Sequence, residues 1–341
     1  MELLSRKGRM RARVALGFLG VIVVLGCLQA TTLPPAQQNG VNWLTAQVQS
    51  DGSLASESSS VANPAQAREE TQVTLGLLAQ APSALVAKVG QNADTNVEYT
   101  ARRIVAAANA SQADSTDLSA LLALQNPDGG WGLTANYQSN PLDTAFALQA
   151  LSAANSAPTQ VTAALTYFSQ VKLADGGWGI TDTSSVYVTA NVLLAANAFA
   201  GQNTNGATVA TAAATWLVGA RNATNDYGNT FDDAYALIAL STQAAQSSAL
   251  APLATALTNT QLADGSWADD PYLTALALRG LWASNQTPVT PTTGSAIAGA
   301  GTPGAPFAPG LGFMRRARRF SRAKIVAPIL PKFSLPPVWS P

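Results

Sequence analysis

The stretch Gln125-Asn-Pro-Asp-Gly-Gly-Trp-Gly132 recurs along this chain. It returns over residues 170–179, which contain Asp175-Gly-Gly-Trp178, and again as Gln261-Leu-Ala-Asp-Gly-Ser-Trp267. Worn copies stand at residues 49–54 and 225–228. A segment that recurs about every 40 to 50 residues indicates one supersecondary unit used repeatedly.

Each copy predicts a turn that is fixed by a buried aromatic ring. Asp bonds to its own backbone in turns, and Gly tolerates positive φ. A Trp buries about 150–250 Å², which is worth about 4–6 kcal/mol as an upper bound. Its indole N–H needs an acceptor, for which a carbonyl at a helix end is suitable. We therefore expect a structural corner between two helices, with these residues in it: Gln125, Gly129, Trp131, Gly176, Trp178, Gln261, Gly265 and Trp267.

A second signature follows each turn. Thr144-Ala-Phe-Ala-Leu-Gln-Ala-Leu151 is one copy, others start at Thr189, Asp233 and Thr274, and looser copies start at 71 and 100. These stretches are apolar nearly all round, as in helices that are buried on most sides, whereas the helices before the turns are one-sided. The repeat therefore predicts six pairs of an outer and an inner helix that close into a ring. The expected pairs are 39–49 with 68–79, 83–90 with 97–109, 115–126 with 141–154, 158–172 with 185–198, 207–220 with 231–243, and 248–262 with 270–284.

Composition narrows the chemistry. The chain of 341 residues is 47% hydrophobic and 11% charged, and it has no His. The absence of His excludes a Ser-His-Asp triad, His zinc ligands and imidazole bases. We expect no metal and no cofactor. Residues 31–284 contain 7 Lys and Arg against 18 Asp and Glu, a net charge of −11. An acidic body argues against nucleic acid as a partner.

The two ends differ from the body, and we expect three segments: 1–30, 31–286 and 287–341. Five basic residues and the apolar run 14–25 predict an export signal. Cys27 follows Val24-Leu25-Gly26, as in a bacterial lipobox. A lipid-anchored form, a cleaved soluble form and an uncleaved membrane anchor all remain open, and each places the protein outside the cytoplasm. Residues 287–341 form a Pro- and Gly-rich linker with a basic tail, which is either a solvated disordered segment or a contact for anionic lipid.

The Gln-x₃-Gly-x-Trp segments resemble the QW motif of the squalene/terpenoid cyclase and protein prenyltransferase superfamily, and the inner-helix signature is similar to it as well. The resemblance covers about residues 39–284. It implies an all-α α6/α6 toroid with a central cavity. Exported bacterial proteins with such repeats also look similar to the barrel of intrinsic factor and transcobalamin, which bind a corrinoid at one mouth.

The catalytic motifs of that superfamily do not carry over. Triterpene cyclases have Asp-x-Asp-Asp, and the nearest stretches here are 230–233 and 267–270, which both lack the first Asp. Prenyltransferases hold zinc through Asp, Cys and His, and this chain has no His and a single Cys. Fold resemblance alone does not establish an activity. The leading hypothesis is therefore a module that binds a ligand or a partner without catalysis. A carboxylate-dependent enzyme acting on terpenes or polysaccharides is the alternative, and a scaffold with a filled centre is the third.

Candidate site residues lie near the starts of the inner helices, which share one mouth of the expected ring. Acids gather there, Glu69 and Glu70 among them, either as helix caps or as a ring of carboxylates. Aromatic residues at the same level either fill the wedges between helices or line a pocket for a small apolar or planar ligand, or for an envelope component. The candidate ligand-binding residues are Asp143, Phe146, Tyr187, Asn191, Asp232, Tyr235, Asp270 and Tyr272. Arg102 occupies the same repeat position as Phe146 and Asn191, and the polar side chains at this position either face a wet cavity or form hydrogen bonds within the ring.

Overall fold

The computed structural model describes residues 33–112, 114–156 and 158–286. The predicted segments 1–30 and 287–341 lie outside this part, as do Cys27 and the basic tail. The chain divides between Pro34 and Pro35 into two units, and the helices described below belong to the second. In the described residues no helix combines the length and apolar character needed to cross a bilayer.

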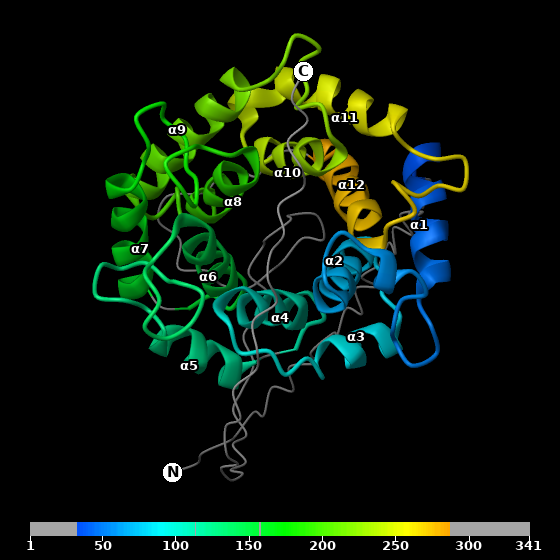
Figure 1. The fold of residues 1–341 in the computed structure, drawn as a ribbon, viewed down its shortest axis with the longest axis horizontal. Coiled ribbons are helices and arrows are strands. Elements are labelled where there is room, and N and C mark those ends of the chain that lie inside the picture. The colour runs from blue at the N-terminus through cyan, green and yellow to red at the C-terminus, as the bar shows by residue number, and fades with distance from the viewer. Residues whose placement is uncertain (1–32, 113, 157, 287–341) are drawn as a thin grey trace, which may run out of the picture. The chain divides into compact units, whose positions relative to one another are not determined.

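The described chain is all-α and arranged as two concentric rings (Figure 1). The outer ring contains α1 (Pro35–Gln47), α3 (Ser83–Val89), α5 (Ser115–Ala123), α7 (Pro158–Gln170), α9 (Thr204–Gly219) and α11 (Leu250–Asn259). The inner ring contains α2 (Pro64–Leu77), α4 (Val97–Asn109), α6 (Pro141–Ala153), α8 (Val186–Asn197), α10 (Thr230–Leu240) and α12 (Pro271–Ser284). Two short 3₁₀ helices, η1 (Glu57–Ser59) and η2 (Ala244–Ala249), complete the described elements.

The ring closes between its first and last helices. α12 packs against α2 and α1, so the inner ring is continuous. Thr74 of α2 donates to the carbonyl of Ala275, and Gln37 of α1 donates from Nε2 to the carbonyl of Leu281. Residues more than 200 positions apart are thereby joined. The predicted closed ring of six helical hairpins is confirmed, and its helix ends fall within a few residues of those expected.

The start of α2 differs from the sequence prediction. α2 starts at Pro64 and not at residue 68, because Asn63 and Gln66 form a reciprocal capping box and Pro64 occupies the first helical turn. Glu69 and Glu70 consequently lie in the second turn of α2. Their assignment to the first turn, where carboxylates cap free N–H groups, is wrong.

The recurring corners are built alike. Trp131, Trp178 and Trp267 are fully buried. Each indole N–H donates to a carbonyl ten residues earlier, at the end of the preceding outer helix, over 2.8, 2.9 and 2.7 Å. Tyr227 replaces Trp in the worn copy, and its hydroxyl donates to Leu217, also ten residues earlier, at 2.6 Å. The four corners thus share an aromatic ring with a hydrogen-bond donor at its tip, and not an indole as such.

The first residue of the inner-helix signature accepts a hydrogen bond from the backbone of the corner. The backbone N–H groups of the three Trp residues donate to Thr144, Thr189 and Thr274 over 2.9–3.0 Å. In the worn copy the N–H of Tyr227 donates to Asp233 Oδ1 over 2.7 Å. Asp233 therefore accepts the hydrogen bond that Thr accepts in the other copies.

The corners also join one outer helix to the next. Gln125 Nε2 donates to the carbonyls of Gly129 and of Gln160 in α7, and Gln261 Nε2 donates to those of Gly265 and of Ala36 in α1. Gly265 has φ of +96°, and a Cβ there would lie 2.5 Å from the Asn39 carbonyl oxygen in α1. Glycine is therefore required both for the backbone angle and for the close approach.

Candidate functional site

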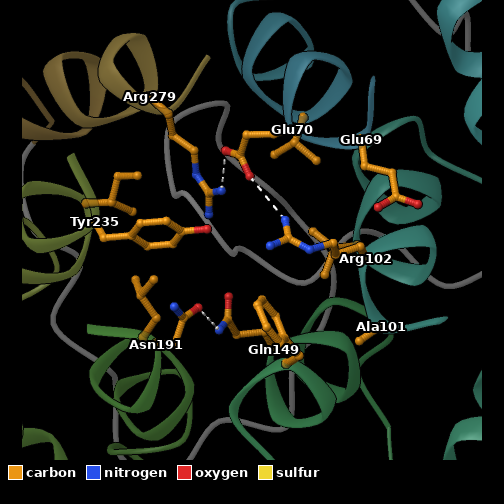
Figure 2. A pocket seen from close by; sticks show the side chains of 13 residues that line it. Glu69, Glu70, Ala101, Arg102, Gln149, Asn191, Tyr235 and Arg279 are labelled. Carbon is orange, nitrogen blue, oxygen red and sulfur yellow. Dashed lines mark hydrogen bonds and ion pairs between the residues drawn. The ribbon is translucent and has the colours of Figure 1, made fainter. Parts of the chain in front are cut away.

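A small cavity lies inside the inner ring, and every inner helix contributes to it (Figure 2). About 40 Å³ is open to the centres of water-sized groups, which is room for about three of them. Each of the six helices contributes at least one polar side chain to the lining: Glu69 and Glu70 of α2, Arg102, Gln149, Asn191, Tyr235 and Arg279. Phe146 adds an aromatic ring.

Helix periodicity explains why these side chains meet. Arg102, Phe146, Asn191 and Tyr235 occupy the third position of the inner-helix signature, and Gln149 and Arg279 occupy the sixth. Positions three apart lie on the same face of a helix. Both positions line the cavity in the four middle hairpins, where Val105, Leu194 and Ile238 occupy the sixth position of the other copies.

A buried ionic group occupies one side of the cavity. Glu70 lies between two arginines: Arg279 Nη1 is 2.7 Å from its Oε1, and Arg102 Nη1 is 3.7 Å from its Oε2. All three side chains are more than nine-tenths buried. Arg102 also donates from Nε to Glu98 at 2.9 Å and from Nη2 to the Tyr272 hydroxyl at 3.3 Å. The guanidinium of Arg102 is therefore held in place by three neighbours.

Aromatic rings surround this arginine. The Arg102 guanidinium carbon lies 4.7 Å from the centroid of the Phe146 ring and 5.9 Å from that of Tyr272. Tyr187 packs edge-on against Tyr235, with ring centroids 4.7 Å apart. The Tyr235 and Tyr272 hydroxyls lie 2.7 Å apart, and burial raises the pKa of all three tyrosines. These phenols consequently remain protonated hydrogen-bonding groups at neutral pH.

The amides of Gln149 and Asn191 form the opposite side. Gln149 Nε2 donates to Asn191 Oδ1 over 3.1 Å, and Asn191 Nδ2 donates to the backbone carbonyl of Tyr187 over 2.9 Å. Both residues are buried. A polar pair is thus placed in an otherwise apolar stretch of α6 and α8.

The acids at the helix starts accept hydrogen bonds from backbone N–H groups or from the residues that cap the helices. Asp270 caps α12 by accepting from Tyr272 and Leu273, and it also accepts from Ser60. Asp232 accepts from Asn229, the cap of α10, and Asp143 accepts from Asn140, the cap of α6. Burial raises the pKa of Asp143 to about 6.

Glu69 is the remaining acid of the lining. It is buried, and burial raises the pKa of its carboxyl to about 7. Its Oε1 accepts from Asn92 at 3.2 Å, while Oε2 has no hydrogen-bond partner among the described residues. In Figure 2 its carboxylate points away from the centre that Glu70 faces.

The predicted site residues divide into two groups. Phe146, Asn191 and Tyr235 line the cavity, as does Arg102, whereas Tyr187 and Tyr272 pack against Tyr235. Asp143, Asp232 and Asp270 belong to helix starts.

Sequence reasoning did not single out Gln149 and Arg279 as cavity residues. Both stand at the signature position where other copies carry Val105, Leu194 and Ile238, so a polar residue at that apolar position was the available signal.

Comparison with known proteins supports the architecture. No family model and no curated protein matches the chain. Among solved structures it is similar to the type II terpene cyclase MstE from Scytonema, with a TM-score of 0.56 at 15% identity over 72% of this chain and 96% of that one.

Two further structures show the same fold. One is an ent-copalyl diphosphate synthase from Streptomyces platensis, with a TM-score of 0.51 at 17% identity over 64% of this chain and 50% of that one. The other is an unsaturated glucuronyl hydrolase specific for heparin, with a TM-score of 0.53 at 13% identity over 73% and 95%. Likeness at this identity shows the fold alone. The chain is therefore a terpenoid cyclase-like α/α toroid, and its activity has to be argued from its own side chains.

Proposed function

We propose that this toroid binds a small planar ligand in its central cavity without transforming it. The observation that carries the proposal is the state of Glu70, the carboxylate that faces the cavity centre. It is paired with Arg279 at 2.7 Å and lies 3.7 Å from Arg102. A carboxylate that is paired with one guanidinium group and lies close to a second is suited to orienting neighbouring groups.

The size of the cavity supports the same conclusion. Pockets for drug-sized ligands measure about 300–1,000 Å³. The space of about 40 Å³ here takes a group of a few atoms, and neither a polyene nor a sugar ring fits. Only a small molecule, or a small head group of a larger one, suits these walls.

The acids at the mouth support it further. Asp270 accepts backbone N–H groups at the start of α12, and Asp232 accepts from the side-chain amide of Asn229, the cap of α10. A carboxylate that accepts backbone N–H groups stabilises a helix end, and its lone pairs are directed there. These acids are therefore structural in our proposal.

A ligand screen tests the proposed function. Thermal unfolding of the purified protein is followed with small planar polar molecules, corrinoids, lipids and glycans, and each compound is also checked for turnover. We expect at least one compound to raise the Tm of the native chain and to raise it less in Gln149→Leu. Conversion of a polyene or glycan to product would show that the protein is an enzyme.

One observation favours an enzyme as the second candidate. Glu69 lines the cavity, is buried, and has a pKa near 7, which is the range of a general acid at neutral pH. The small cavity and the direction of the side chain argue against it. If turnover is found, its loss in Glu69→Gln with retained folding would identify Glu69 as the acid.

We further propose that the toroid is exported. The support is the basic and apolar sequence of residues 1–30, with Cys27 in a lipobox-like context. Mass spectrometry of the mature N-terminus in a bacterial host distinguishes the three forms. An acylated Cys27 identifies a lipoprotein, and a free new N-terminus identifies a cleaved form. An intact Met1 identifies either a membrane anchor or an unexported protein, and cell fractionation distinguishes these two.

A further inference from the structure

The orientation of the Gln149 amide is fixed by a backbone group. The carbonyl of Tyr187 can only accept, so the Asn191 group that meets it is Nδ2. Asn191 Oδ1 then faces Gln149, whose Nε2 must be the donor across 3.1 Å. Gln149 Oε1 is therefore directed into the cavity, as Figure 2 shows.

Glu70 and Arg102 also have hydrogen-bonding capacity that faces the cavity. Arg102 uses Nε for Glu98 and Nη2 for Tyr272. Its Nη1 lies 3.7 Å from Glu70 Oε2, which is longer than a hydrogen bond. Arg279 Nη1 contacts the other oxygen of Glu70, and the Tyr235 hydroxyl is a further hydrogen-bond partner of the Arg102 guanidinium. One donor and one acceptor thus face the Gln149 acceptor from the other side of the cavity.

The charges around the cavity balance. The guanidinium groups of Arg102 and Arg279 face the carboxylates of Glu70 and Glu98. Glu69 is the other acid of the lining, and because burial raises the pKa of its carboxyl to about 7, it adds no charge below that pH. An added anion or cation would leave a net charge among groups that are mostly buried, which is costly. The electrostatics therefore favour a neutral guest.

We propose that the cavity binds a neutral primary amide or ureido group. Its carbonyl oxygen accepts from Arg102 Nη1, and its NH₂ group donates to Glu70 Oε2 and Gln149 Oε1. A flat head group of four heavy atoms matches the space of about 40 Å³. This inference rests on the proposed function and specifies its ligand class.

Four planar molecules of equal size test the inference. Acetamide has a donor and an acceptor and is neutral, acetate is an anion, acetamidinium is a cation, and acetone has an acceptor alone. The full chain is titrated with each and followed by ligand-observed NMR, because molecules this small bind with affinities on the order of millimolar. We expect acetamide to bind about tenfold more tightly than the other three, as the loss of one or two hydrogen bonds requires.

A variant and a signal locate the binding. Gln149→Leu removes the acceptor with little change in volume and should weaken acetamide binding about fivefold or more. Gln202→Leu, at an exposed position, is the matched control and should change nothing. If Gln149→Leu does not fold, the native protein still gives the answer, because bound acetamide should shift the side-chain amide signals of Gln149 and Asn191.

The outcomes separate the two proposals. Tighter binding of acetate or acetamidinium overturns the neutral-amide inference, and so does binding that leaves the Gln149 signals unmoved. If acetamide does not bind while another compound stabilises the protein in a Gln149-dependent way, the inference fails and the proposed function stands. Hydrolysis of acetamide to acetate would overturn the non-catalytic function while leaving the ligand class in place.

Discussion

Removing one hydroxyl from a corner tests how the corners stabilise the ring. Tyr227→Phe deletes the phenol oxygen that donates to the Leu217 carbonyl at 2.6 Å and leaves the ring in place. Tyr227 replaces the Trp of the other corners, whose indole groups make the same contact ten residues back. The substitution therefore isolates the donor from the packing of the ring.

The expected cost follows from the environment of the acceptor. A typical intramolecular hydrogen bond contributes about 0.5–1.5 kcal/mol, and an acceptor left unsatisfied costs about 1–3 kcal/mol. Leu217 is buried at the end of α9, whereas Tyr227 is only half-buried, so we expect about 1–2 kcal/mol. In a domain of this size that corresponds to a decrease in Tm of about 2–8 °C.

A second tyrosine provides the control. Tyr137 is 48% exposed, and Tyr137→Phe should change the free energy of unfolding by less than about 0.5 kcal/mol. Both variants are compared by urea unfolding and by thermal scans. If Tyr227→Phe were as stable as Tyr137→Phe, the donor at the tip of the ring would not stabilise the corner, and our account of the repeat would be wrong.

Three further experiments test other parts of the structure. Gly176→Ala and Gly265→Ala face similar backbone strain, because φ is +93° at Gly176 and +96° at Gly265. Only Gly265→Ala places a Cβ 2.5 Å from the Asn39 carbonyl oxygen, so this variant should have the lower Tm by several degrees. At pH 7, Asp233→Thr should unfold at the same urea concentration as the native chain or at a higher one, because Thr accepts the hydrogen bond from the corner N–H in the other repeats. Asp233→Ala removes this acceptor and should lower the free energy of unfolding by about 1 kcal/mol. Glu69→Gln should abolish one part of the pH dependence of stability, measured by urea unfolding between pH 4 and 8.

The sign of the pH effect follows from the burial of Glu69. Burial raises the pKa of this carboxyl from 4.5 to about 7, so the folded chain keeps a proton that the unfolded chain loses. Its contribution to stability is greatest below pH 4.5 and declines by up to about 3 kcal/mol as the pH rises through 7. Relative to the native chain, Glu69→Gln should therefore gain stability as the pH increases. An unchanged difference between the two proteins across this range would contradict a buried, protonated Glu69.

The architecture could be predicted from the sequence because it depends on local chemistry that repeats. Asp-Gly-Gly-Trp specifies a turn wherever it occurs, and the Thr-Ala-x-Ala-Leu stretch specifies a buried helix. Six copies in phase leave a ring as the arrangement that buries all the inner helices. The start of α2 was misplaced because Asn63, Pro64 and Gln66 form a capping box that the repeat does not contain.

The cavity was only half predicted, because its contacts are long-range. The third signature position indicated Arg102 and Asn191 as residues facing the centre. The Glu70–Arg279 pair joins residues 209 positions apart, and no spacing reveals such a partner. The acids at the mouth drew attention as potential catalysts, but helix starts use those carboxylates for their own N–H groups, as Asp270 does.

The central claim is that six inner helices together form one polar binding cavity. A crystal structure of the full chain grown with acetamide tests it most directly. We predict a flat molecule in contact with Arg102 Nη1, Glu70 Oε2 and Gln149 Oε1, with the Glu70–Arg279 pair intact. A centre filled by side chains, or a Gln149 amide turned away from it, would contradict the account.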